Sequence, residues 1–166
     1  MTRQIKVGDV LIGGGAPVVI QSMLNTKTTD VEGSLAQIRA LKDAGCQIAR
    51  LAIPNQASLG AFAEICRLSE LPLVADIHFD YKLAIGAAEA GASKIRINPG
   101  NIGGEENVKA VVDICKERKI PIRIGVNGGS LEKSLLEKYG HPTAEALVES
   151  AFSHLELLEK YGFYDT

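Results

Sequence analysis

An α/β fold with a parallel sheet is predicted by three features of the sequence. Apolar runs rich in β-branched residues alternate with amphipathic helical stretches five times along the chain. The units recur every 20 to 30 residues, so each helix can connect two parallel strands. The later part of several runs alternates apolar with polar residues, as barrel interiors do near one end. We therefore expect a parallel (β/α)8 TIM-barrel type of fold, incomplete, with about five βα units present, rather than a doubly wound sheet with both faces apolar.

The first unit combines a strand over Val18–Met23 with a helix. Thr29 or Asp30 is expected to cap this helix, because short polar side chains accept hydrogen bonds from its first N–H groups. Gly45 is expected to end it. The apolar stripe of the helix comprises Leu35, Ile38 and Leu41.

The second and third units follow the same order. The second strand is expected over Ile48–Ile53 and ends at Pro54, and the third is expected over Leu71–Ile77. Asp80 is the expected cap of the third helix, an alanine-rich segment that ends at Gly91. The apolar stripe of the second helix comprises Leu59, Phe62 and Ile65.

The fourth and fifth units carry the most polar loops. The fourth strand is expected over Lys94–Asn98 and the fifth over Pro121–Val126, each followed by a glycine-rich segment. A last helix is expected from about Thr143 to Tyr161. The expected inner residues of the fourth helix are Val108, Val111, Val112 and Cys115, and those of the last helix are Leu147, Ala151, Leu155 and Leu158.

The length of the chain is short for this fold. Eight units need about 250 residues, and this chain has 166. A sixth strand is expected to begin at residues 162–166, so residues 1–166 are expected to be the N-terminal part of a barrel domain that lacks its last strands. Two open sheet edges should make this chain alone poorly soluble, oligomeric or loosely packed.

Composition excludes several classes of function. A net charge of −2 and a pI near 5.9 give no basic surface for nucleic acid. No apolar run reaches membrane-spanning length, and the first six residues lack a signal-peptide core. We expect a cytoplasmic protein. Its cysteines are odd in number, widely spaced and in predicted helices, so we expect packed thiols rather than disulfides or metal ligands, at Cys46, Cys66 and Cys115.

Three arginines occupy equivalent places in three predicted strands: Arg50, Arg96 and Arg123. Strand side chains alternate between faces, so Ile95 and Ile97 lie opposite Arg96. One face can then pack against helices while the other holds charge. Converging guanidinium groups suit a diphosphate, whose oxygens accept forked hydrogen bonds. Salt bridges to buried carboxylates are the alternative.

Other polar residues lie at the same predicted strand ends. Asp76 and His78 share a strand face, so Asp76 could orient an arginine or a substrate hydroxyl, and His78 could donate a hydrogen bond or transfer a proton. A neutral histidine bonded to backbone is the alternative for His78. The segments 98–104 and 127–130 can direct N–H groups toward an anion, although a simple turn also explains them. No third ligand accompanies Asp76 and His78, so we expect no metal site.

Four segments resemble the 4-hydroxy-3-methylbut-2-enyl diphosphate synthase family, the iron-sulfur enzymes of the non-mevalonate isoprenoid pathway. The segments are Gln21–Thr26, Leu73–Asp80, Arg96–Gly103 and Pro121–Lys133. The resemblance runs from about Lys6 to the C-terminus, and its long uninterrupted motifs make it specific.

The resemblance implies an oxidoreductase that opens the ring of 2-C-methyl-D-erythritol 2,4-cyclodiphosphate with two electrons and loss of water. In this family an N-terminal barrel binds the diphosphate, and a C-terminal domain holds a 4Fe-4S cluster with three cysteines and a glutamate. Ferredoxin or flavodoxin supplies the electrons, and a homodimer places one subunit's cluster over another's barrel. The residues that match the family's substrate-binding motifs are Arg50, Arg96, Arg123, Asn98, Asn127, Gln21, Asp76 and His78.

The sequence departs from the family pattern at its C-terminal side. It lacks the last barrel strands and the cluster domain, so we expect no cluster and no turnover from residues 1–166 alone. Two other classes remain open: another phosphate-binding barrel synthase, such as a pterin-type enzyme, and a non-catalytic binding or assembly fragment.

Overall fold

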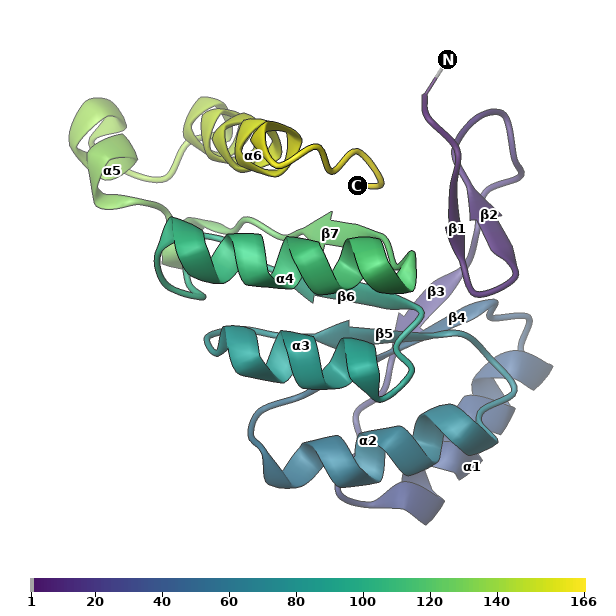
Figure 1. Cartoon of the computed structure of the whole chain (residues 1–166). Coiled ribbons are helices and arrows are strands. Elements are labelled where there is room, and N and C mark those ends of the chain that lie inside the picture. The colour runs from purple at the N-terminus through teal and green to yellow at the C-terminus, as the bar shows by residue number, and fades with distance from the viewer. Residues whose placement is uncertain (1) are drawn as a thin grey trace.

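A five-stranded parallel sheet forms the centre of the protein, described by a computed structural model that covers residues 2–166 (Figure 1). Its strands are β3 (Gln21–Met23), β4 (Ile48–Ala52), β5 (Leu73–Asp76), β6 (Lys94–Ile97) and β7 (Ile122–Ile124). They pair in chain order, β3-β4-β5-β6-β7, without the reversal that defines a doubly wound sheet. The arrangement is an arc of a barrel, which confirms the predicted fold class and its incompleteness.

Helices cover the convex face of this arc. They are α1 (Val31–Asp43), α2 (Ala57–Leu68), α3 (Tyr81–Glu89), α4 (Glu105–Arg118) and α6 (Ala144–Lys160). A 3-10 turn, η1 (Gly128–Ser130), and the short helix α5 (Lys133–Tyr139), which packs against α6, lie between β7 and α6. Neighbouring helices touch in the order α1, α2, α3, α4 and α6. Phe62 and Ile38 from the helices are fully buried against Leu51 and Ile95 from the strands. Burial of each such side chain stabilises the fold by about 1.5–3 kcal/mol.

The helix ends follow the predicted signals. Asp30, rather than Thr29, caps α1, since its Oδ1 accepts a hydrogen bond from Gly33 N at 3.0 Å. Asp80 caps α3 in the same way through Lys82 N. The cap closes the first turn of each helix and fixes the direction in which the chain leaves the preceding strand end.

An N-terminal hairpin was not predicted. It consists of β1 (Ile5–Val7) and β2 (Val10–Ile12), joined by a turn in which Gly8 has φ +57°. Figure 1 shows it at the end of the sheet opposite α5. Val7 packs there against Ile48 and Val74, which point to the concave face of the sheet. The hairpin thus covers the concave face at the end of the sheet where the strands begin.

Two edge strands are shorter than expected. β3 begins at Gln21 rather than Val18, and β7 covers Ile122–Ile124 rather than Pro121–Val126. Val18 is 94% exposed. Within residues 2–166, each of these strands pairs with another strand on one side only, so fewer of its backbone groups are held in a ladder.

The buried face of α6 differs from the prediction. Its buried residues are Ala146, Ser150, His154 and Leu158, whereas Leu147, Ala151 and Leu155 are only half-buried. Of the predicted inner residues, Leu158 is fully buried, and Leu147 packs in part against Leu131, Leu135 and Ala146. The helix packs against α5 through Ala146 and leaves Ala151 and Leu155 beside the open edge of β7. The short helix α5, also unpredicted, contacts α6 through the cluster of Leu131, Leu135 and Ala146.

The last residues return to the sheet. The Asp165 carbonyl accepts a hydrogen bond from Ile122 N at 2.9 Å, so residues 163–166 run beside the start of β7. In residues 2–166, none of the helices combines the length and the apolar character that crossing a membrane requires.

Candidate functional site

Strand pairing brings the predicted site residues to one face. Asp76 pairs with Arg96 across β5 and β6, and Arg96 pairs with Arg123 across β6 and β7. Paired residues in a parallel sheet point to the same face, and here their chain neighbours Ile95 and Ile97 belong to the core under the helices. The charged side chains therefore lie on the concave face of the arc.

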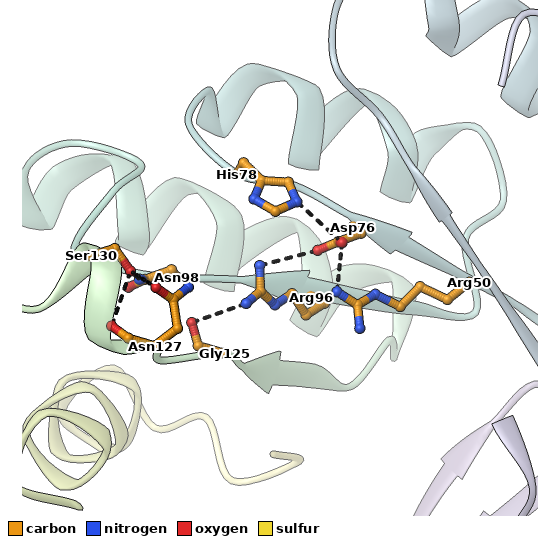
Figure 2. A network of polar contacts seen from close by, with 8 residues as sticks. All are labelled: Arg50, Asp76, His78, Arg96, Asn98, Gly125, Asn127 and Ser130. Carbon is orange, nitrogen blue, oxygen red and sulfur yellow. Dashed lines mark hydrogen bonds and ion pairs between the residues drawn. The ribbon is translucent and has the colours of Figure 1, made fainter. Parts of the chain in front are cut away.

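Asp76 is the centre of a polar network on this face (Figure 2). Its side chain is 1% exposed, and its two oxygens contact three groups. Oδ2 accepts from Arg50 at 2.6 Å and lies 3.2 Å from His78 Nε2, while Oδ1 accepts from Arg96 at 3.2 Å. Arg96 also donates to the Gly125 carbonyl at 3.3 Å. Asp76 therefore fixes the direction of two guanidinium groups.

Positive charge exceeds negative charge on the concave face. Burial lowers the pKa of the Arg123 guanidinium, and the charges of Arg50 and Arg96 lower it further, against a smaller opposing effect of Asp76. Burial also lowers the pKa of Lys94, with Arg123 adding to the effect. Within residues 2–166, neither Arg123 nor Lys94 has an ion-pair partner. Asp76 forms ion pairs with Arg50 and Arg96 but not with Arg123 or Lys94, and the surplus positive charge favours an anion.

Two loops at the carboxyl end of the sheet are joined by amide side chains. Asn98, 2% exposed, donates from Nδ2 to Ser130 Oγ at 2.8 Å, and its Oδ1 accepts from Gly100 N at 3.1 Å. Asn127 begins the η1 turn, where its Oδ1 accepts from Gly129 N at 3.1 Å and lies 3.1 Å from Ser130 Oγ. The two predicted asparagines therefore belong to one hydrogen-bonded unit beside Arg96 (Figure 2).

Gln21 and His78 occupy different positions relative to the network. The imidazole of His78 is about half exposed and bonds to the Asp76 carboxylate instead of to backbone. Gln21 pairs with Ile48, two residues before the point where Met23 pairs with Arg50. It lies nearer the hairpin end, and within residues 2–166 no hydrogen bond joins its side chain to the Asp76 network.

Sequence reasoning missed several residues of this region. Gly125 follows β7 and leaves room for the Arg96 guanidinium, which a Cβ at position 125 would overlap. Glu132, Ser150 and His154 form a polar cluster behind the two loops. One signal was available: Ser150 and His154 are four residues apart on α6, where a helix presents both to the same neighbour.

The three cysteines are free thiols, as expected from their spacing. Burial raises the pKa of the Cys66 and Cys115 thiols to about 12, so both are protonated at neutral pH. Cys46 is buried, and its thiol donates to the Ile48 carbonyl. Among the described residues, 2–166, no group of three or more His, Cys, Asp or Glu side chains is arranged to hold a metal ion.

The profile of the GcpE TIM-barrel domain family matches residues 2–166. The chain belongs to this GcpE family. Its relatives in the family include two proteins named 4-hydroxy-3-methylbut-2-en-1-yl diphosphate synthase (flavodoxin). The protein of Idiomarina loihiensis is 59% identical over 164 residues, which are 99% of this chain and 44% of the relative. That of an Exiguobacterium species is 57% identical over 166 residues, which are 100% of this chain and 44% of the relative. The GcpE chain thus spans less than half the length of these curated relatives.

Solved structures support the fold of this GcpE chain. Dihydropteroate synthase of Yersinia pestis matches with a TM-score of 0.65 at 11% identity, over 98% of this chain and 59% of that one. Phospho-2-dehydro-3-deoxyheptonate aldolase of Thermotoga maritima matches with a TM-score of 0.55 at 18% identity, over 98% and 43% of the two chains. At such low identities these likenesses concern the fold alone.

Proposed function

We propose that residues 1–166 form the N-terminal, substrate-binding part of the barrel of a 4-hydroxy-3-methylbut-2-en-1-yl diphosphate synthase. The observation that carries the proposal is the surplus of cations on the concave face, where Asp76 is the carboxylate that contacts Arg50 and Arg96. Buried or half-buried cations need anionic partners. The diphosphate of 2-C-methyl-D-erythritol 2,4-cyclodiphosphate supplies two negative charges and several acceptor oxygens.

Each residue has a role in holding this anion. Asp76 keeps the guanidinium groups of Arg50 and Arg96 in place, so little side-chain freedom is lost when the diphosphate binds. Arg123, which lacks a carboxylate partner within residues 2–166, binds the anion directly. Asn98 and Asn127 supply neutral hydrogen bonds from the loops.

His78 lies at the boundary between the network and solvent. Its Nε2 contacts Asp76, and its ring lies against Phe79 with 6.0 Å between ring centroids. From this place His78 can donate a hydrogen bond to a substrate oxygen or pass a proton to it. Gln21, which lies toward the hairpin, has the weakest structural support among the proposed binding residues.

The overall reaction adds two electrons to the cyclic diphosphate, opens its ring and releases water. The 4Fe-4S cluster that such an enzyme uses for electron transfer does not fit the cysteines of this chain, because Cys46, Cys66 and Cys115 lie on separate elements and burial raises the pKa of the Cys66 and Cys115 thiols to about 12. We therefore assign its ligands to another part of the full-length protein and its electron supply to flavodoxin, which the relatives' names mention. A homodimer and a cytoplasmic location remain predictions.

Substitution of Arg96 tests the proposal. We expect Arg96→Ala in the full-length protein to weaken binding of the cyclic diphosphate by about 1.5–3 kcal/mol, the usual contribution of a hydrogen bond to a charged group. Isothermal titration calorimetry measures this change. Arg118→Ala is the control, because Arg118 lies at the far end of α4 with its side chain 46% exposed. Unchanged affinity in Arg96→Ala would remove Arg96 from the site, and a pterin that bound in place of the diphosphate would favour a different synthase.

A further inference from the structure

A buried polar cluster lies behind the two loops of the proposed site. Glu132 precedes α5, while Ser150 and His154 lie one turn apart on α6. Glu132 Oε1 accepts from Ser150 Oγ at 3.0 Å and lies 2.6 Å from His154 Nε2. His154 is only 8% exposed. The cluster therefore connects the start of α5 with the middle of α6.

Stability alone does not account for this cluster. Although His154 Nε2 and Glu132 Oε1 are close, the imidazole is not aligned for a hydrogen bond, and both His154 Nε2 and Glu132 Oε2 are buried without a hydrogen-bond partner among residues 2–166. Unsatisfied buried polar atoms cost free energy, and apolar residues of similar size stabilise such positions better. The pair therefore calls for an explanation other than stability.

The cluster touches the loop that carries Asn98. A Cβ at Gly100 would lie 3.2 Å from Glu132 Oε1 and 3.4 Å from His154 Nε2, so the backbone of this loop lies directly against the pair. Gly100 N donates to Asn98 Oδ1 at 3.1 Å. Glu132 and His154 therefore limit where Gly100 can lie. Gly100 in turn orients the Asn98 amide through this hydrogen bond.

The cluster also lies beside the second loop. Glu132 follows Ser130 by two residues, and Ser130 Oγ accepts from Asn98 Nδ2 at 2.8 Å and lies 3.1 Å from Asn127 Oδ1. Glu132 thus holds one end of the 127–132 segment to α6. The Asn98 amide is therefore held by Gly100, which lies against the cluster, and by Ser130, which lies two residues before Glu132 in the chain.

We propose that Glu132 and His154 are positioning residues for diphosphate binding, which hold Asn98, and through Ser130 also Asn127, in the orientation that binds the anion. The inference rests on the proposed function, since it assigns the pair a role at that site. Neither residue contacts the diphosphate. The pair acts through the Gly100 turn on one side and the 127–132 segment on the other.

Substitutions of His154 test the inference in the full-length protein. His154→Leu should weaken binding of the cyclic diphosphate at least tenfold, and His154→Gln, which restores an N–H group near Glu132, should recover most of the affinity. Titration calorimetry gives the affinity, and thermal unfolding shows whether each variant folds. His141→Leu is the matched control, because His141 is exposed and outside the cluster, and it should bind as the unchanged protein does.

A double-mutant cycle separates positioning from general destabilisation. If His154 acts through Asn98, His154→Leu should add little to the loss caused by Asn98→Ala, but should add fully to the loss caused by Arg50→Ala. Should His154→Leu fail to fold, the milder Ser150→Ala and Glu132→Gln replace it under the same criteria.

The outcomes distinguish the inference from the proposed function. Wild-type affinity in the His154 or Glu132 variants, or full additivity with Asn98→Ala, overturns the inference while Arg96→Ala still weakens binding. If the unchanged protein does not bind the cyclic diphosphate, the proposed function and the inference both fail.

Discussion

Two arginines share the carboxylate of Asp76, and this arrangement decides how the site tolerates substitution. Arg50 and Arg96 have side chains 20% and 10% exposed, so solvent compensates little for the loss of their partner. A nearby third guanidinium, Arg123, adds repulsion. The Asp76 carboxylate therefore orients Arg50 and Arg96, and its negative charge allows the two cations to lie close together.

Removal of the Asp76 charge should destabilise the protein. We expect Asp76→Asn to lower the free energy of unfolding of the full-length protein by about 3 kcal/mol, the low end of the range for breaking a buried ion pair, because both guanidinium groups keep some solvent contact. Urea titration measures the change. Asp9→Asn, which alters a fully exposed carboxylate paired with Lys6, should leave stability nearly unchanged. Equal stabilities of the two variants would show that Asp76 is not needed to hold the arginines.

At the level of elements, the chain just after β7 depends on Gly125, which has no side chain. Gly125 N donates to the Ile97 carbonyl at 2.8 Å, which continues the β6–β7 ladder by one bond. A Cβ at this position would overlap the Arg96 guanidinium. The glycine thus lets the strand end approach a buried arginine from the neighbouring strand.

Gly125→Ala should displace that arginine. We expect at least a tenfold loss of affinity for the cyclic diphosphate, about 1.4 kcal/mol, because the guanidinium must leave Asp76 and the Gly125 carbonyl to make room. Calorimetry on the full-length protein measures it. Gly60→Ala is the control: its Cβ would meet open space within α2, so binding should persist and stability should rise slightly. Normal binding by Gly125→Ala would mean that Arg96 can bind the anion from another rotamer.

The buried thiol of Cys115 on α4 predicts that the stability of the protein depends on pH. Burial raises the pKa of the Cys115 thiol from an ordinary value of 9.0 to about 12. The unfolded chain then loses the proton first, so the contribution of this group to stability is complete below pH 9 and falls as the pH rises toward 12.

This loss should amount to about 1.4 kcal/mol per pH unit above pH 9. We expect the full-length protein to lose stability more steeply than its Cys115→Ala variant between pH 9 and pH 10.5, while the difference between them stays constant from pH 7 to pH 8. Urea titrations at each pH measure both. Parallel curves above pH 9 would show that the thiol ionises without unfolding.

At the scale of the whole molecule, the sheet is an arc with two edge strands. β3 and β7 each pair with another strand on one side within residues 2–166, and exposed apolar residues lie at the β3 edge, namely Ile20 just before the strand and Met23 at its end. Unpaired strand edges and exposed apolar surface favour association.

Residues 1–166 on their own should therefore self-associate or unfold without a sharp transition. Light scattering coupled to size-exclusion chromatography and urea unfolding at several protein concentrations measure both properties. The full-length protein, whose remaining chain can cover these edges, is the comparison. A monomeric chain of residues 1–166 with a sharp, concentration-independent transition would contradict this prediction.

The sequence by itself determined the five repeated βα units and the face on which the charges lie. Both depend on local rules: strand side chains alternate, so Arg96 had to oppose Ile95 and Ile97, and Asp30 and Asp80 cap helices through their own first turns. The shared motifs indicated the family, which the match to the GcpE TIM-barrel domain confirms.

Only the tertiary structure decided which groups meet across the fold. The contact of Asn98 with Ser130, the approach of Gly100 to His154 and the packing of Val7 on Ile48 join segments far apart in the chain. Such contacts depend on the register and tilt of whole elements. The orientation of α6, which buries His154 rather than Leu155, likewise became visible only once α6 was seen packed against α5.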